Sequence, residues 1–293
     1  MDAYFDTNVY GHIYRRDDGV TDALVSTLED AVQSQAVRIF TSYAVVEETN
    51  AARLKYLDET NGRFELIRTL AVQERVVRLH SEIIDADIRA YANGEESPDK
   101  FQKAYPRLRE VFWDHTAKHY KELDSYARDT QHAVDAFTKD LDDSFNRLIR
   151  PLAKEAKKEK KQQSFSDYWD EMSEPWVEQL ASKYGMLDEC RAKGLKGLLD
   201  IHSIRISTIA QVSLTYANTY EREKFARGNS RDMQHVVCAS AVPIFVTHDR
   251  ELTRLLARMP SPNLEIVDLH TLMARIVTEP RAVASGSRFN RRM

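Results

Sequence analysis

Four acidic residues lie either directly after expected strands or on expected helices of an α/β fold. They are Asp6 in YFDTN, Glu48 in TSYAVVEET, Asp232 in NSRDMQH and Asp249 in IFVTHD. Asp6 and Asp249 follow short apolar runs typical of buried parallel strands, whose carboxyl ends meet in one crevice. Carboxylates gathered there repel one another unless a cation neutralises them, and their oxygens suit Mg²⁺ or Mn²⁺. The pattern therefore predicts metal-assisted hydrolysis of a phosphodiester bond.

Four further polar residues are placed in sequence where they can support such a site. Asn8 is expected to hydrogen-bond Asp6 or a phosphate. Ser42 and Thr247 are expected to orient the carboxylates by donating hydrogen bonds from behind the metal. His235 lies one helical turn after the third acidic residue, where it either contacts substrate or has an ordinary surface or packing role.

The two ends of the chain carry the alternation of strands and helices expected of one α/β domain. In the first 62 residues we expect strands at 3–5 and 37–41 and helices at 21–32 and 43–57. From Gly228 we expect helices at 230–240, 251–259 and 269–276 and strands at 243–247 and 264–267. These two parts together have the size of an ordinary domain. We therefore expect a discontinuous α/β domain formed by residues 1–62 and 203–278.

Between these parts, residues 63–202 have a different character. Apolar residues recur at steps of three and four over 120–152, which predicts a long helix. Residues 65–89, 176–191 and 201–221 also read as helices. We expect an all-helical insertion that packs on itself and offers a surface for a second copy or another protein. Residues 279–293, rich in Arg, Ser and Gly, are expected to form a disordered tail.

The order of the acidic segments resembles the PIN-domain family of ribonucleases. That family carries an N-terminal D-x-N, a Glu in its second helix, an Asp on a later helix and a late T-x-D. This chain has the same order over roughly residues 1 to 62 and 203 to 275. The resemblance implies a three-layer fold with a central parallel sheet, an endonuclease acting on RNA, and Mg²⁺ or Mn²⁺ held by Asp6, Glu48, Asp232 and Asp249. Toxins of that family are small and lack such an insertion, which argues against a toxin role.

The second acidic segment contains two adjacent glutamates, and only one of them can face the site. On a helix, Glu47 and Glu48 point about 100° apart. The PIN-like spacing counted from Ser42 favours Glu48 and leaves Glu47 on the surface.

Composition and charge limit where the protein works and how it binds. No apolar run is long enough to span a bilayer, and the first strand follows Met1 too closely for a signal peptide. Cys190 and Cys238 lack metal-ligand spacing and fit a reducing compartment, so we expect a cytoplasmic protein with no membrane partner. The net charge of -4 does not indicate nucleic-acid binding by itself, so any such surface must be local.

Two other functions stay open on the sequence. A structure-specific DNA nuclease on a related fold usually carries a fuller acidic cluster and a helical DNA-binding motif, which we do not find. A catalytically silent PIN-like scaffold would use the long helices for protein assembly. Retention of all four acidic positions argues against the scaffold.

Overall fold

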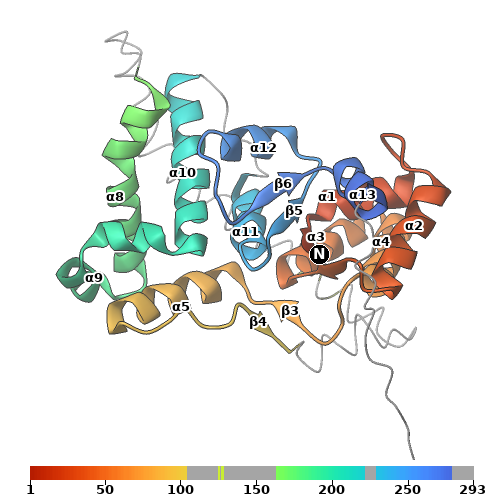
Figure 1. The fold of residues 1–293 in the computed structure, drawn as a ribbon, viewed down its shortest axis with the longest axis horizontal. Coiled ribbons are helices and arrows are strands. Elements are labelled where there is room, and N and C mark those ends of the chain that lie inside the picture. Colours follow the sequence, from red (N-terminus) through yellow and green to blue (C-terminus); the bar gives the residue numbers. More distant parts are fainter. Residues whose placement is uncertain (104–124, 126, 129–162, 222–228, 279–293) are drawn as a thin grey trace, which may run out of the picture.

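The computed structural model describes residues 1–103, 125, 127–128, 163–221 and 229–278, which fold around a four-stranded parallel sheet (Figure 1). The strands are β1 (Asp2–Phe5), β2 (Arg38–Phe40), β5 (Ile244–Val246) and β6 (Glu265–Val267). Their order is β2-β1-β5-β6, and each neighbouring pair runs parallel. The predicted α/β class, the parallel sheet and the positions of its four strands are therefore confirmed.

Helices from both ends of the chain surround this sheet. The N-terminal part supplies α1 (Thr7–Arg15), α2 (Asp22–Gln33), α3 (Tyr43–Ala51), the 3₁₀ turn η1 (Ala52–Leu54) and α4 (Leu57–Leu70). The C-terminal part supplies α11 (Asn229–Ala239), α12 (Arg250–Ala257) and α13 (Leu269–Thr278). Helices α1, α2, α3 and α12 begin at side-chain caps, because a short polar side chain there accepts a first-turn backbone N–H. The caps are Asp6, Thr21, Ser42 and Asp249.

Both faces of the sheet are covered, as its apolar strands require. Successive residues of a strand point to opposite faces, so Tyr4 and Phe5 of β1 meet different helices. The Tyr4 hydroxyl lies 2.8 Å from Nδ1 of His235 on α11. The Phe5 ring packs against the ring of Tyr10 on α1, with 5.8 Å between centroids. Strand β1 therefore lies between a helix of the N-terminal part and a helix of the C-terminal part.

The strand order opens one crevice at the edge of the sheet. From β1 the chain leads to β2 on one side, and from β5 it leads to β6 on the other side. The segments that follow β1 and β5 therefore diverge, and ligands of open α/β sheets bind at such a switch point. Phe5 is paired with Val246, so the residues after them, Asp6 and Thr247, leave the sheet at the same level.

The inserted segment adds a second group of helices beside the sheet. Its elements are β3 (Val76–Val77), α5 (His80–Asn93), β4 (Phe101–Gln102), α8 (Phe165–Lys183), α9 (Leu187–Lys193) and η3 (Leu195–Asp200). Helix α10 (His202–Tyr220) then leads back toward the C-terminal part. Helices α8 and α10 lie side by side (Figure 1), and α5 and α10 both pack against α11. The insertion therefore supports the helix that covers one face of the sheet.

The prediction of an all-helical insertion is wrong in its first part. Strand β3 pairs antiparallel with β4, so the helix predicted over 65–89 is two helices, α4 and α5, with a strand between them. The β-branched residues Val76 and Val77 are buried and suit a strand better than a helix surface. The boundary predicted at residue 62 lies within α4.

Two predictions fall largely on parts of the chain that the structure does not describe. The helix predicted over 120–152 lies outside the described residues except at 125, 127 and 128, and the tail 279–293 lies outside them entirely. Among the described helices, none is both long and apolar enough to cross a membrane.

A buried polar contact connects the inserted helices and provides a test of their packing. Ser203 of α10 donates a hydrogen bond to Asp87 of α5, and both side chains are buried. We expect Asp87→Ala to lower the free energy of unfolding by about 1–3 kcal/mol, because the Ser203 hydroxyl loses its partner. Asp85→Ala, which breaks an exposed ion pair with Arg89 on the same helix, should cost less than about 1 kcal/mol. Urea unfolding measures both, and equal small losses would contradict this role for Asp87.

Candidate functional site

Asp6 is held at the point where β1 ends and α1 begins. Its carboxylate accepts hydrogen bonds from the backbone N–H of Thr7 at 2.6 Å, from Nδ2 of Asn8 at 2.9 Å and from Oγ1 of Thr247 at 2.8 Å. Thr247 also accepts the backbone N–H of Asp249 at 3.0 Å. These contacts join the ends of β1 and β5, so both acidic residues that follow strands belong to one site.

A buried row of polar side chains reaches Glu48 from the interior. Nε2 of His235 lies 2.9 Å from Oε2 of Glu48 and 3.7 Å from Oδ1 of Asp6. Its Nδ1 lies 2.8 Å from the hydroxyl of Tyr4, which in turn lies 2.7 Å from Oγ of Ser42. His235 is only 1% exposed, so it positions Glu48 from behind and does not reach a substrate.

The charges of His235 and Glu48 stabilise each other. Burial disfavours a charged imidazole, but the charge of Asp6 and the hydrogen bond with Glu48 outweigh burial and raise the pKa of His235 to about 9. Burial also disfavours ionised Glu48, and the hydrogen bond and charge of His235 outweigh it and lower the pKa of Glu48 to about 2. At pH 7 the two groups form a part-buried ion pair, in which the imidazolium donates a hydrogen bond and offers no lone pair to a metal.

Asp232, in the first turn of α11, completes an acidic cluster with the other three residues. Burial and the negative charges of Asp249, Asp6 and Glu48 raise the pKa of Asp232 to about 8, against the opposing charge of His235. Burial and the charge of Glu48 likewise raise the pKa of Asp6, again against His235. The four carboxyl groups therefore act on one another, and one imidazolium does not balance them.

The donor set of this cluster fits a hard divalent cation. Ligand atoms of Asp6, Glu48 and His235 lie within 4.8 Å of one another. Because His235 carries a proton at pH 7, the donors available are carboxylate oxygens, which suit Mg²⁺ or Mn²⁺. The raised pKa of Asp232 is the physical sign that positive charge would be stabilised here.

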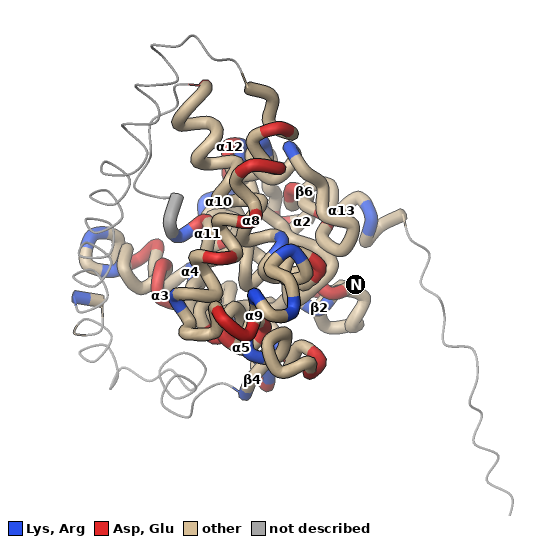
Figure 2. The backbone as a smooth tube through the Cα atoms, turned by 90° about the vertical axis from the view of Figure 1, so that its left-hand side faces the viewer, with Lys and Arg blue, Asp and Glu red and all other residues tan. Residues whose placement is uncertain are grey.

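A cleft of about 330 Å³ opens beside the acidic cluster. It is lined by Thr7, Asn8, Arg15, Glu48, Ala51, Ala52, Arg63 and Arg231. Arg15 and Arg63 both donate to Oε1 of Glu59, and Arg231 lies 3.9 Å from Oε1 of Glu48. Basic and acidic residues are otherwise interspersed along the described helices (Figure 2). The cleft therefore combines local positive charge with the acidic cluster.

The structure brings together the four acidic residues predicted from sequence. The hydrogen bonds expected from Asn8 and Thr247 to Asp6 are present. The Ser42 hydroxyl instead contacts the Tyr4 hydroxyl and accepts the backbone N–H of Val45, so it is connected to Glu48 through Tyr4 and His235.

Sequence reasoning missed three residues around the acids. Tyr4 belongs to an expected apolar strand, but a buried tyrosine hydroxyl requires a polar partner and so signals a nearby polar group. Arg15 and Arg63 lie near the acids only in three dimensions. No motif in the sequence distinguishes them from other arginines.

Comparisons with known proteins do not assign this chain to a family. No family model matches it, and the searches of curated proteins and of solved structures return no match. The chemistry of the cluster therefore has to be argued from the geometry and charges described above.

The raised pKa of Asp232 predicts a pH-dependent cost to stability. Between pH 3.8 and about 8 this group is protonated in the folded protein and ionised in the unfolded chain. The folded state then binds more protons, so this contribution to stability falls as pH rises. In EDTA, we expect Asp232→Asn to melt several degrees above the wild type at pH 8, on the order of 2–4 °C per kcal/mol, and near it at pH 4.

Calorimetry at several pH values measures this difference. Asp22→Asn, which changes an exposed carboxylate at the start of α2, controls for net charge and should show no such trend. A difference between Asp232→Asn and wild type that stays constant with pH would contradict the assignment of the proton to Asp232.

Proposed function

We propose that this protein is a PIN-like, metal-dependent nuclease that hydrolyses phosphodiester bonds in RNA as an endoribonuclease. One observation carries the proposal. Four carboxyl groups from four separate segments meet at the crevice between β1 and β5, and an arginine-lined cleft opens directly beside them. This is the combination that phosphodiester hydrolysis requires: anionic ligands for a divalent cation and cationic groups for the phosphate backbone.

The residues around the acids support metal binding by holding them in place before any ligand arrives. Asp6 is fixed by three hydrogen bonds, and Glu48 is fixed by the ion pair with His235. Both carboxylates therefore keep one orientation, which reduces the entropy lost when a cation binds. Asp6, Glu48, Asp232 and Asp249 would hold the ion, directly or through water.

An ion held by these carboxylates would supply a Lewis acid for the phosphate and would lower the pKa of a bound water molecule. The chain contributes the rest. Arg15, Arg63 and Arg231 face the cleft where phosphates of the strand would lie. His235 keeps Glu48 ionised, so that this ligand stays available down to low pH. No protein nucleophile is required.

The choice of RNA over DNA comes from the PIN-like order of the acidic residues. The same site would suit a structure-specific DNA nuclease, and a scaffold without activity would not need it. Incubating the full chain with labelled single-stranded RNA, single-stranded DNA and branched DNA, each with Mn²⁺ or with EDTA, separates the three. We expect Mn²⁺-dependent cleavage within the RNA. Cleavage of branched DNA alone would favour the DNA nuclease, and absence of any cleavage together with absence of Mn²⁺ binding would favour the scaffold.

Neutral replacements of the acids test their assignment without disturbing the helix caps. Asn caps a helix about as well as Asp, so Asp6→Asn and Asp249→Asn should fold while losing charge. We expect each to reduce Mn²⁺-dependent RNA cleavage by about a hundredfold or more. Cleavage at the wild-type rate by Asp6→Asn would refute the site.

The two adjacent glutamates of α3, Glu47 and Glu48, provide a variant and its matched control. Glu48 contacts His235 and lines the cleft, whereas the charge of Glu47 acts on Cys238 in the interior. We therefore expect Glu48→Gln to abolish most of the cleavage and Glu47→Gln to leave most of it. The reverse result would mean that the wrong face of α3 has been assigned to the metal.

The arginines of the cleft are expected to bind phosphate and to leave the chemical step largely unchanged. Replacing Arg63 and Arg231 by Gln should raise KM for RNA about tenfold and reduce the slope of log affinity against log salt by about 1 for each lost phosphate contact. Lys196→Gln, at an exposed lysine of η3, is the control and should change neither. A fall in kcat with unchanged KM would contradict a binding role.

A further inference from the structure

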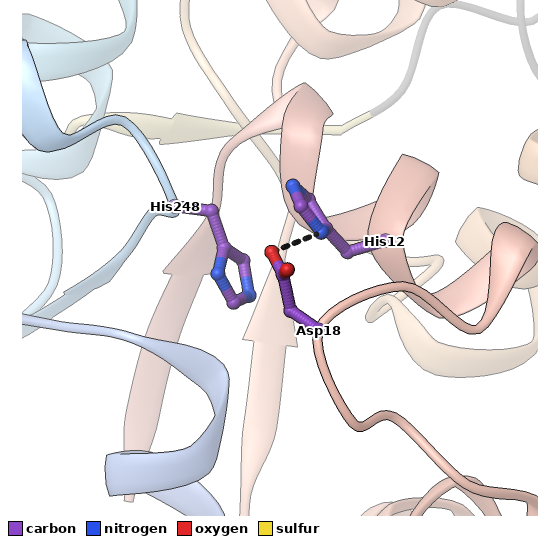
Figure 3. A group of neighbouring side chains, drawn as sticks. All are labelled: His12, Asp18 and His248. Carbon is purple, nitrogen blue, oxygen red and sulfur yellow. Dashed lines mark ion pairs between the residues drawn. The ribbon is translucent and has the colours of Figure 1, made fainter.

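A second group of metal-ligating side chains lies apart from the acidic cluster. It consists of His12 on α1, Asp18 in the turn after α1 and His248 in the loop between β5 and α12. One ligand atom from each residue lies within 4.8 Å of the others. Figure 3 shows the three side chains pointing toward one another from separate segments. The proposed function uses none of them.

The distance between the ligand atoms of His12 and Asp18 is close to that between two ligands of one tetrahedral metal ion. Nδ1 of His12 lies 3.1 Å from Oδ2 of Asp18. Two ligands of a tetrahedral zinc ion, each about 2.1 Å from the metal, are separated by about 3.4 Å. The rings of His12 and His248 are stacked, with centroids 4.2 Å apart and planes inclined by 26°. A ring nitrogen of His248 therefore lies beside this pair, within 4.8 Å of the ligand atoms of His12 and Asp18.

The local contacts leave one of these donors unused. Nε2 of His248 is buried and has no hydrogen-bond partner among the residues that the structure describes. Buried ring nitrogens are usually paired, so an unpaired one is available to a ligand. A fourth residue fixes the turn that carries Asp18: Nε2 of His270 lies 2.7 Å from the backbone oxygen of Asp18.

We propose that His12, Asp18 and His248 bind a Zn²⁺ ion at a site separate from the carboxylate site. Two imidazoles and one carboxylate favour zinc over Mg²⁺ or Ca²⁺, which prefer sites made of oxygen ligands. Three protein ligands leave the fourth position of a tetrahedral ion to water.

Such an ion would fix α1 against the loop that follows β5. The backbone N–H of His248 donates to Oδ1 of Asn8 at 3.2 Å, and Nδ2 of Asn8 donates to Asp6. The loop held by zinc therefore also holds the residue that orients Asp6. The ion stabilises this part of the fold whether or not the neighbouring acids catalyse a reaction.

Calorimetric titration of the metal-free full chain with Zn²⁺, in the presence of excess Mg²⁺, tests the site without an activity assay. We expect one equivalent to bind, and His12→Gln, Asp18→Asn and His248→Gln each to weaken binding about tenfold or more. Asp6→Asn is the matched control in the acidic cluster and should bind Zn²⁺ as the wild type does. Co²⁺ should give visible absorption bands of a tetrahedral site in the wild type, and these should be absent in His248→Gln.

The outcomes distinguish this site from the proposed nuclease site. Failure of the wild type to bind Zn²⁺ would overturn the proposal and leave the nuclease untouched. Binding that persists in His12→Gln and His248→Gln but is lost in Asp6→Asn would move the ion to the acidic cluster and overturn it as well. Asp18 lies on the surface, with 65% of its side chain exposed, so Asp18→Asn remains informative even where a histidine variant fails to fold.

Discussion

The mutual repulsion of four carboxyl groups at one edge of a parallel sheet is the constraint on which the rest of the site depends. A buried imidazolium at His235, hydrogen bonds to Asp6 and a proton on Asp232 each reduce that repulsion in a different way. Together, these three interactions still leave an excess of negative charge at the site. The fold therefore maintains, at a cost in stability, a place where a divalent cation is favoured.

The sheet accounts for how segments so far apart in sequence can meet. Strand β1 is central, and its neighbours come from opposite ends of the chain. The pairing of Phe5 with Val246 brings the residues after β1 and β5 to one level, and α11 brings His235 and Asp232 over the same edge. The insertion contributes no predicted ligand, but α5 and α10 pack behind α11 and so determine its position.

The fold was predictable from sequence wherever one pattern had one physical meaning. Short apolar runs gave the four strands, and Thr21 marked the start of α2, because burial and capping act locally. The prediction failed at Val76 and Val77. Their apolar spacing is compatible with a helix, but pairing with β4, which is distant in sequence, makes this segment a strand.

The acidic residues of the site were predictable from the sequence, but most of the residues around them were not. The four acids lie after strands or on helices that the sequence predicts, and their gathering follows from strand order. The links of Tyr4 to Ser42 and His235 could not be read in advance, because they join residues from three elements whose relative rotation depends on packing. The same holds for the arginines of the cleft and for the His12, Asp18 and His248 group, where turn geometry and ring stacking define the neighbours.

The segment between α4 and α5 has a consequence for how the molecule behaves in a crowded solution. Its backbone donates from Val72 to Ile39 and from Val77 to Thr41, along the outer side of β2. An uncovered outer strand is a template for strands of other molecules and promotes aggregation. The start of the insertion thus covers the outer edge of β2 and prevents it from pairing with strands of other molecules. At the opposite edge of the sheet, the ion pair of Glu265 with Arg275 places charge beside β6. Loss of this short stretch would leave the backbone groups along the outer side of β2 open to strands of other molecules.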